Sequence, residues 1–262
     1  MLYLGTDAIT SLSLEVDDPN KRTDATDLGT WSSTSDVDTF LSRFNHENNY
    51  DDGTTKLHLG DTIYIADGTY NMGWRIAGFD CEYNREAADD TVYNNGYGIM
   101  LYPRSIASYL SCYWNEENTV AGGYKASLAH SKVNNFATNM KNSILGTHLV
   151  NRNVLLSSDI NSSGNSNDYT WTTAYSALPS VGHLEGTFNR SGTKYDDGEA
   201  NYRLPLFNYQ DYIKNYDHWL RNIHYKENSN YRVYYVKAYS LLSDIVQVNY
   251  TSKYLHPLLY IR

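Results

Sequence analysis

The sequence predicts an α+β fold in which a mixed or antiparallel β core is closed by the last strand of the chain. Short strand-like segments recur along most of the sequence, whereas only residues 127–145 have a strong helical period. The strand pattern also continues to the final residues, where chain ends are normally frayed. We therefore expect the last strand to pair with residues 62–65 and seal the domain. We also expect one long helix, two shorter helices, long polar loops and an extended N-terminal arm.

The first fifty-five residues differ from the rest and predict an arm with one docking helix. Residues 17–36 are mostly polar and could not bury enough apolar surface to fold alone. Val37, Phe40, Leu41 and Phe44 then follow at helical spacing. Such an arm lies either on its own domain or on a neighbouring subunit. The large apolar residues of this arm are the candidate assembly contacts: Trp31, Phe40 and Phe44.

A second unit, residues 56–262, begins with a series of strands. Turn residues on both sides of residues 62–65 indicate a hairpin, which residues 74–79 continue. Residues 98–102 form the next strand, and Pro103 ends it.

The long helix follows, because Val133, Phe136, Ala137, Met140 and Ile144 keep a helical period and Gly146 stands where a C-cap is expected. A strand at residues 154–156, a helix at 209–219 and strands at 231–236 and 245–248 complete the expected elements.

Residues 157–201 predict a long polar loop region with a role in binding. The segment is rich in Ser, Gly, Asn, Asp and Thr, and a loop of this length is uncommon in a compact domain unless it has a function. Aromatic residues within it are the candidate contacts to a host or partner molecule: Tyr169, Trp171 and Tyr175.

Composition excludes some classes of partner. The net charge is -9 and the 21 basic residues are scattered, which argues against nucleic acid. No apolar stretch is long enough to span a bilayer, and no secretory signal is visible, so we expect synthesis in the cytoplasm without membrane insertion. The 26 tyrosines and 27 asparagines fit either an adaptable contact surface or a tyrosine-rich core in an asparagine-heavy sequence.

No constellation of catalytic or metal-binding residues emerges. The histidines are dispersed without zinc-ligand spacing, and Cys81 and Cys112 are expected to be free, partly buried thiols. Residues 159–170 resemble the start of a calcium loop, but Thr170 stands where a bidentate Glu is required, and a plain turn is the better interpretation. We expect no cofactor and no metal.

Five segments resemble a domain that is common in structural proteins of tailed bacteriophages infecting gut bacteria. They are residues 59–65, 74–80, 123–127, 219–221 and 255–261. The family usually ends on Val-Arg-Pro before an apolar strand, where this chain has Leu-His-Pro. The resemblance covers residues 56–262 and implies a C-type-lectin-like fold, which is used for display and receptor binding; its motifs are structural and carry no catalytic residues.

The resemblance implies a non-enzymatic virion protein, such as a capsid decoration protein, a head fibre, or a tail or baseplate component. Its partners would be other virion proteins and further copies of itself, joined through the N-terminal arm. The alternative is a module that binds a glycan or protein on the host surface through residues 157–201. The third alternative is an enzyme on a related fold, such as a glycan hydrolase or a formylglycine-generating-type oxidase. The oxidase would need two active-site cysteines close in sequence, whereas Cys81 and Cys112 are thirty-one residues apart.

Overall fold

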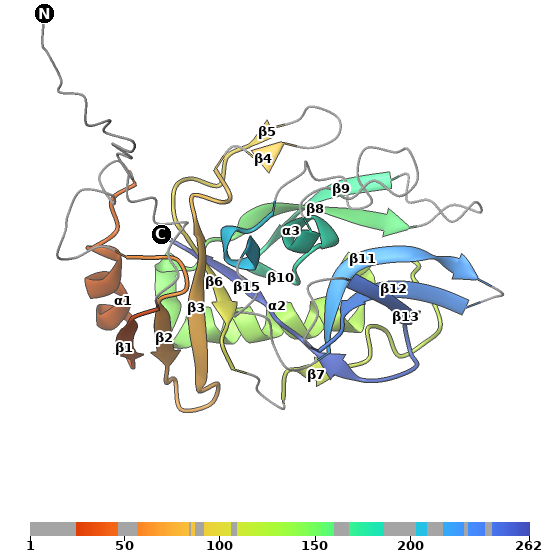
Figure 1. Ribbon diagram of the computed structural model, residues 1–262, viewed down its shortest axis with the longest axis horizontal. Coiled ribbons are helices and arrows are strands. Elements are labelled where there is room, and N and C mark those ends of the chain that lie inside the picture. The colour runs from red at the N-terminus through yellow and green to blue at the C-terminus, as the bar shows by residue number, and fades with distance from the viewer. Residues whose placement is uncertain are drawn as a thin grey trace, which may run out of the picture.

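A computed structural model describes residues 25–46, 57–83, 85–86, 92–105, 109–159, 168–185, 203–208, 217–227, 230–238 and 243–262. Within these residues the chain forms two main sheets, two hairpins and a few helices (Figure 1). This arrangement confirms the α+β class. In the part of the chain that is described, the sheets do not close into a barrel.

The first main sheet has six strands and includes the last strand of the chain. Across the sheet these are β1 (Asp27–Trp31), β2 (Thr62–Ile65), β3 (Met72–Phe79), β6 (Ile99–Pro103), β15 (Leu258–Ile261) and β10 (Ser176–Ala177). β1 lies parallel to β2, and the other neighbouring pairs are antiparallel. The continuous apolar strands β3, β6 and β15 are buried along almost their whole length, so they lie in the middle of the sheet.

The sequence predicted that the closing strand pairs with residues 62–65, and this prediction is wrong. β15 lies between β6 and β10, with Leu259 opposite both Leu101 and Ser176. All four residues of β15 are buried, so this strand needs a neighbour on each side. β2 instead pairs with β1 and β3 and exposes Tyr64.

The second main sheet has five strands and comes mostly from the last third of the chain. In order they are β13 (Ser243–Gln247), β12 (Asn230–Val236), β11 (His218–Glu227), β14 (Lys253–Tyr254) and β7 (Ser111–Cys112). The predicted strands at 231–236 and 245–248 are therefore confirmed. The predicted helix at 209–219 is wrong at its end, because Trp219 lies in β11; residues 209–216 lie outside the described part of the chain.

Two hairpins complete the β structure, and one of them replaces part of the predicted loop. They are β4 (Arg85–Glu86) with β5 (Val92–Tyr93), and β8 (Arg152–Asp159) with β9 (Asp168–Ala174). The prediction of one long loop over residues 157–201 is therefore wrong for β9, for β10 and for a short helix. The Thr, Trp and Tyr residues of β9 suit a pleated strand even within a polar stretch. Residues 160–167, which include most of the calcium-like string, lie outside the described residues, as do 186–200.

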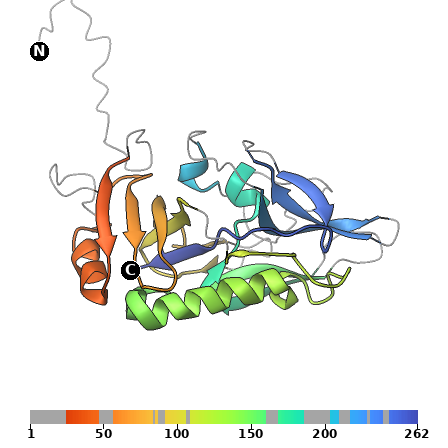
Figure 2. The same ribbon diagram turned by 90° about the horizontal axis from the view of Figure 1, so that it is seen from below.

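The long helix is confirmed, with a change of geometry near its end. The α-helices are α1 (Thr34–Leu41), α2 (Leu128–Met140) and α3 (Val181–Glu185); a π-helical turn η2 (Lys141–Leu145) and 3₁₀ turns η1 (Tyr124–Ala126), η3 (Gly146–His148) and η4 (Pro205–Asn208) accompany them. Ser127 caps α2, because its hydroxyl accepts the backbone N–H of His130. Figure 2 shows α2 lengthwise along one side of the molecule, where Phe136 stacks on Trp74 of β3.

Part of the predicted arm belongs to the same sheet and core as the later residues. β1 pairs with β2, and Trp31, Val37 and Phe40 are buried in the larger of the two hydrophobic clusters. Tyrosine lies both in the core and on the surface: the Tyr124 and Tyr260 side chains are fully buried, whereas Tyr64 and Tyr250 are exposed.

Candidate functional site

The three residues predicted to bind a host or partner molecule occupy different environments. Trp171 of β9 is half-buried, and its ring lies on Tyr93 of β5 with the ring centroids 4.1 Å apart. Tyr175 packs against the large core cluster beneath the Lys141 ammonium group. Tyr169 pairs with Ser157 in the hairpin, and its side chain lies outside the described part. Of the two side chains that are described, Trp171 stacks on another aromatic ring and Tyr175 packs against the core.

The three predicted assembly residues pack within the chain. Trp31 and Phe40 are buried with their ring centroids 4.8 Å apart, and Phe44 is half-buried and stacks on Phe79 of β3. These rings attach α1 to the six-stranded sheet. Trp31 and Phe40 consequently have almost no exposed surface to offer to a neighbouring subunit.

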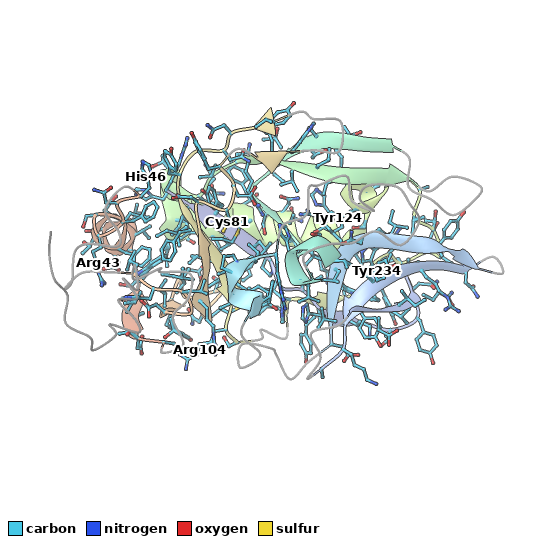
Figure 3. All side chains as sticks on the ribbon, turned by 45° about the horizontal axis from the view of Figure 1, so that its top comes forward. Arg43, His46, Cys81, Arg104, Tyr124 and Tyr234 are labelled. Atoms are coloured by element: carbon cyan, nitrogen blue, oxygen red, sulfur yellow. The ribbon has the colours of Figure 1, made fainter. Side chains whose placement is uncertain are left out.

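A ladder of three stacked rings lies on the surface just beyond α1; we call it the ring stack (His46, Tyr97 and Tyr83). The His46 ring is 3.5 Å from that of Tyr97 at an interplanar angle of 9°, and the Tyr83 ring is 4.2 Å from Tyr97 at 16°. Tyr83 and Tyr97 are 36% and 37% exposed. In Figure 3, His46 lies nearer the rim of the molecule than Cys81, which precedes Tyr83 by two residues.

The backbone that carries Tyr83 and Tyr97 is fixed by hydrogen bonds between its two ends. Asp80 adopts a φ of 54°, a left-handed conformation that Asp tolerates because its side chain bonds locally. Its backbone N–H donates to Gly98 O at 2.7 Å, and its carboxylate accepts the Gly98 N–H at 2.9 Å. The Tyr83 N–H then donates to Asp80 O, which places Tyr83 in a tight turn at the end of β3.

A buried polar network lies beneath this turn and joins it to β8. Glu82 forms an ion pair with Arg152, and both side chains are almost fully buried. Asn95 donates its side-chain amide to Asn153 O and accepts the Asn153 N–H at 2.8 Å. The Tyr260 hydroxyl donates to Gly96 O at 2.8 Å. These bonds attach both ends of the β3–β6 connection to β8 and β15, so the ring stack has a rigid support.

Charge near the ring stack is moderate. Burial raises the pKa of Asp80 from its ordinary value, and the Gly98 N–H and the His46 charge oppose this shift. Burial also raises the pKa of Tyr260. The Tyr260 phenol is therefore neutral at neutral pH. The partly buried Asp80 carboxyl group faces the His46 ring, and the Arg262 guanidinium lies beside Gly96, which precedes Tyr97.

Each ring group includes at least one tyrosine from the connection between β3 and β6, residues 80–98. It carries Tyr83, Tyr93 and Tyr97, while His46 and Trp171 are contributed by other parts of the chain. We call these five residues the aromatic surface; they form two ring groups, and Tyr93 and Trp171 of the second group are half-buried. Sequence reasoning did not single out four of them: His46, Tyr83, Tyr93 and Tyr97. The available signal was the set of three tyrosines within a polar connection between two apolar strands.

Two further features are candidate sites: a buried histidine–tyrosine cluster and a hollow beside α2. His218 and His256 stack with their centroids 4.0 Å apart, and His256 Nδ1 is 2.6 Å from the Tyr102 hydroxyl, but all three side chains are buried. An open hollow of about 330 Å³ beside the start of α2 is lined in part by Glu116 and Glu117. Among the described residues, no three His, Cys, Asp or Glu side chains are grouped to hold a metal ion.

Both cysteines are free and buried, as the sequence predicted. Burial raises the pKa of Cys112 to about 11, and the nearby Lys132 only partly opposes this, so its thiol is poorly nucleophilic at neutral pH. No helix in the described ranges is both long and apolar enough to cross a membrane.

Comparisons with known proteins gave no match, whether to a protein-family model, to a curated protein or to a solved structure.

Proposed function

We propose that this chain is a non-enzymatic component of a tailed-bacteriophage virion that displays a C-type-lectin-like domain and binds a molecule on the host surface. The resemblance of the five segments between residues 59 and 261 supports both the virion origin and the lectin-like topology. The α+β architecture with two main sheets is compatible with such a domain. A capsid decoration protein, a head fibre and a tail or baseplate part all satisfy this proposal.

The observation that carries the recognition role is the aromatic surface. Tyrosine rings provide large amphipathic contacts at a small cost in conformational entropy, which is why they are common in binding surfaces. Tyr83 and Tyr97 are already stacked, and the buried Glu82–Arg152 pair and Asn95 hold their backbone. A surface that is ordered before binding loses little freedom when its ligand arrives.

This proposal moves the functional emphasis from the N-terminal arm to the β3–β6 connection. Trp31 and Phe40 are buried in the chain's own core, so we no longer assign them to assembly. Trp171 remains a candidate contact through its stacking on Tyr93.

Adsorption of the labelled full-length chain to host cells tests the recognition role. The Tyr83→Ser/Tyr97→Ser variant should lose most adsorption, while Tyr250→Ser should adsorb normally, because Tyr250 is 75% exposed and belongs to neither ring group. Thermal unfolding must show that both variants are folded. Equal adsorption of the two variants would refute the role of the ring stack. The virion location has its own test: an antibody against the chain should label purified phage particles, and failure to label them would refute that location.

A further inference from the structure

Three buried polar side chains meet where the two main sheets join, and we call them the histidine–tyrosine cluster (Tyr102, His218 and His256). Tyr102 lies in β6 of the six-stranded sheet, and His218 is the first residue of β11 in the five-stranded sheet. His256 lies in the connection from β14 to β15, where the chain passes from the second sheet to the first. Each residue is at most 2% exposed, so their mutual contacts join the two sheets without water.

The two imidazole rings of the cluster are stacked and share one hydroxyl group. Their centroids are 4.0 Å apart at an interplanar angle of 17°. The Tyr102 hydroxyl oxygen is 2.6 Å from His256 Nδ1 and 3.4 Å from His218 Nε2. A phenol has a single proton, so Tyr102 can donate to one ring and accept from the other. This sharing requires that at least one of the two facing nitrogens carries no proton.

The elements that pack against the cluster bring further charges close to it. The Arg75 charge of β3 acts on Tyr102. Lys253 of β14 forms an ion pair of 2.8 Å with Asp217, which precedes His218 in the chain. A proton on either imidazole therefore adds to the positive charge that Arg75 already brings to the cluster. The titratable and charged residues on or next to the packed elements are Arg75, Arg203, Asp217, Lys253 and Tyr254.

We propose that the histidine–tyrosine cluster is an acid-sensitive latch between the two main sheets, closed at neutral pH and open when both rings carry a proton. Histidine rings in water take up a proton at about pH 6.5, so below that pH an opened cluster is favoured over a closed one. Two charged rings stacked at 4.0 Å would repel each other. Both facing nitrogens would also become donors, and the Tyr102 proton would lose its acceptor in the cluster. This inference does not depend on the proposed recognition function.

The part of the junction that opens is the connection from β14 to β15. β14 has two residues, and its neighbourhood is held by few backbone bonds: the Tyr254 N–H donates to Asp217 O at 3.1 Å, and the Leu255 N–H donates to Leu110 O at 2.8 Å. Segments held by few contacts open before the rest of a domain. Movement of this connection away from Tyr102 would bring the His256 ring into water, where it can keep its proton.

Amide hydrogen exchange measured by NMR on the full-length chain, between about pH 7.5 and about pH 5, tests the latch. The Tyr254 and Leu255 N–H groups are the reporters, because their bonds break when the connection opens. After correction for intrinsic exchange, uptake of two protons on opening should raise the opening constant about a hundredfold for each pH unit below about 6.5. The Ile76 N–H, which donates to Asp61 O at the first sheet, should not follow this dependence.

Matched variants assign the dependence to the two rings. His256→Asn and His218→Gln each keep a polar atom near the nitrogen that faces Tyr102, but an amide does not take up a proton. Each single variant should reduce the dependence to about tenfold per pH unit, and the double variant should remove it. His130→Gln removes a buried histidine of α2 that is not part of the cluster, and it should keep the full dependence.

The outcomes separate the latch from simpler effects of acid. An opening constant at Tyr254 and Leu255 that does not change with pH in the unaltered chain would overturn the inference, and this measurement needs no variant to fold. Equal dependence at Ile76 would show that acid unfolds the whole chain, which also overturns it. Loss of the dependence in His130→Gln, or its full retention in the folded double variant, would assign it to other groups and overturn the latch as well.

Discussion

Removing the charge of Glu82 should destabilise the chain strongly, although Glu82 does not contact solvent or a ligand. The Glu82 and Arg152 side chains are 5% and 1% exposed, so Glu82→Gln leaves a buried guanidinium charge without its counter-ion. Breaking a buried ion pair in this way costs about 3–5 kcal/mol. For a chain of this size, that corresponds to a fall in Tm of about 10 °C. Urea denaturation followed by tryptophan fluorescence measures the loss directly.

A matched surface pair and a double variant complete this test. Asp38 is 62% exposed and pairs with His148, so Asp38→Asn should cost less than about 1 kcal/mol. Glu82→Leu/Arg152→Met removes both charges and should recover much of the stability that Glu82→Gln loses, because apolar residues can replace a buried pair. A Glu82→Gln cost no larger than that of Asp38→Asn, or a double variant as unstable as the sum of its single changes, would refute this reasoning.

Three further predictions follow from burial. Burial and the nearby Lys125 lower the pKa of His130 from 6.5 to about 4, so the folded state resists protonation of this ring. The unfolded chain takes up the proton first, and the stability contributed by the neutral ring is therefore lost as the pH falls from about 6.5 to about 4. This loss is about 3 kcal/mol, and urea curves for His130→Gln should lack it; an unchanged pH slope would contradict the assignment. A thiol reagent should label Cys81 and Cys112 only after denaturation, and rapid labelling of the native chain would show that these sites open. Deleting residues 1–24 keeps β1 and α1, whereas deleting residues 1–55 removes the buried side chains of Trp31, Val37 and Phe40. The longer deletion should lower the free energy of unfolding by about 6 kcal/mol. Equal Tm values for the two truncated chains would contradict the packing of α1.

Local pattern was sufficient to predict the helices and strands whose signal lies within one segment. The helical spacing of Val133, Phe136 and Met140 identified α2, because residues three and four positions apart share a helix face regardless of the rest of the fold. β3 and β6 were identified because each is a short apolar run bounded by turn residues or proline. The hairpin strand β9 was missed, since its alternating Thr and aromatic residues stand in a polar stretch and their burial depends on neighbours.

Strand partners and the aromatic surface were decided by tertiary structure. Backbone hydrogen bonds between strands do not depend on side-chain identity, so the apolar pattern of residues 258–261 predicted a strand but not its place between β6 and β10. His46, Tyr83 and Tyr97 are separated in sequence. They meet because Phe44, which follows α1, stacks on Phe79 of β3 and the two ends of the β3–β6 connection are bonded together. The sequence by itself determined the α+β class, the long helix and the excess of tyrosine. Only the folded chain determined which tyrosines fill the core and which are stacked on its surface, because burial is a property of contacts between distant segments.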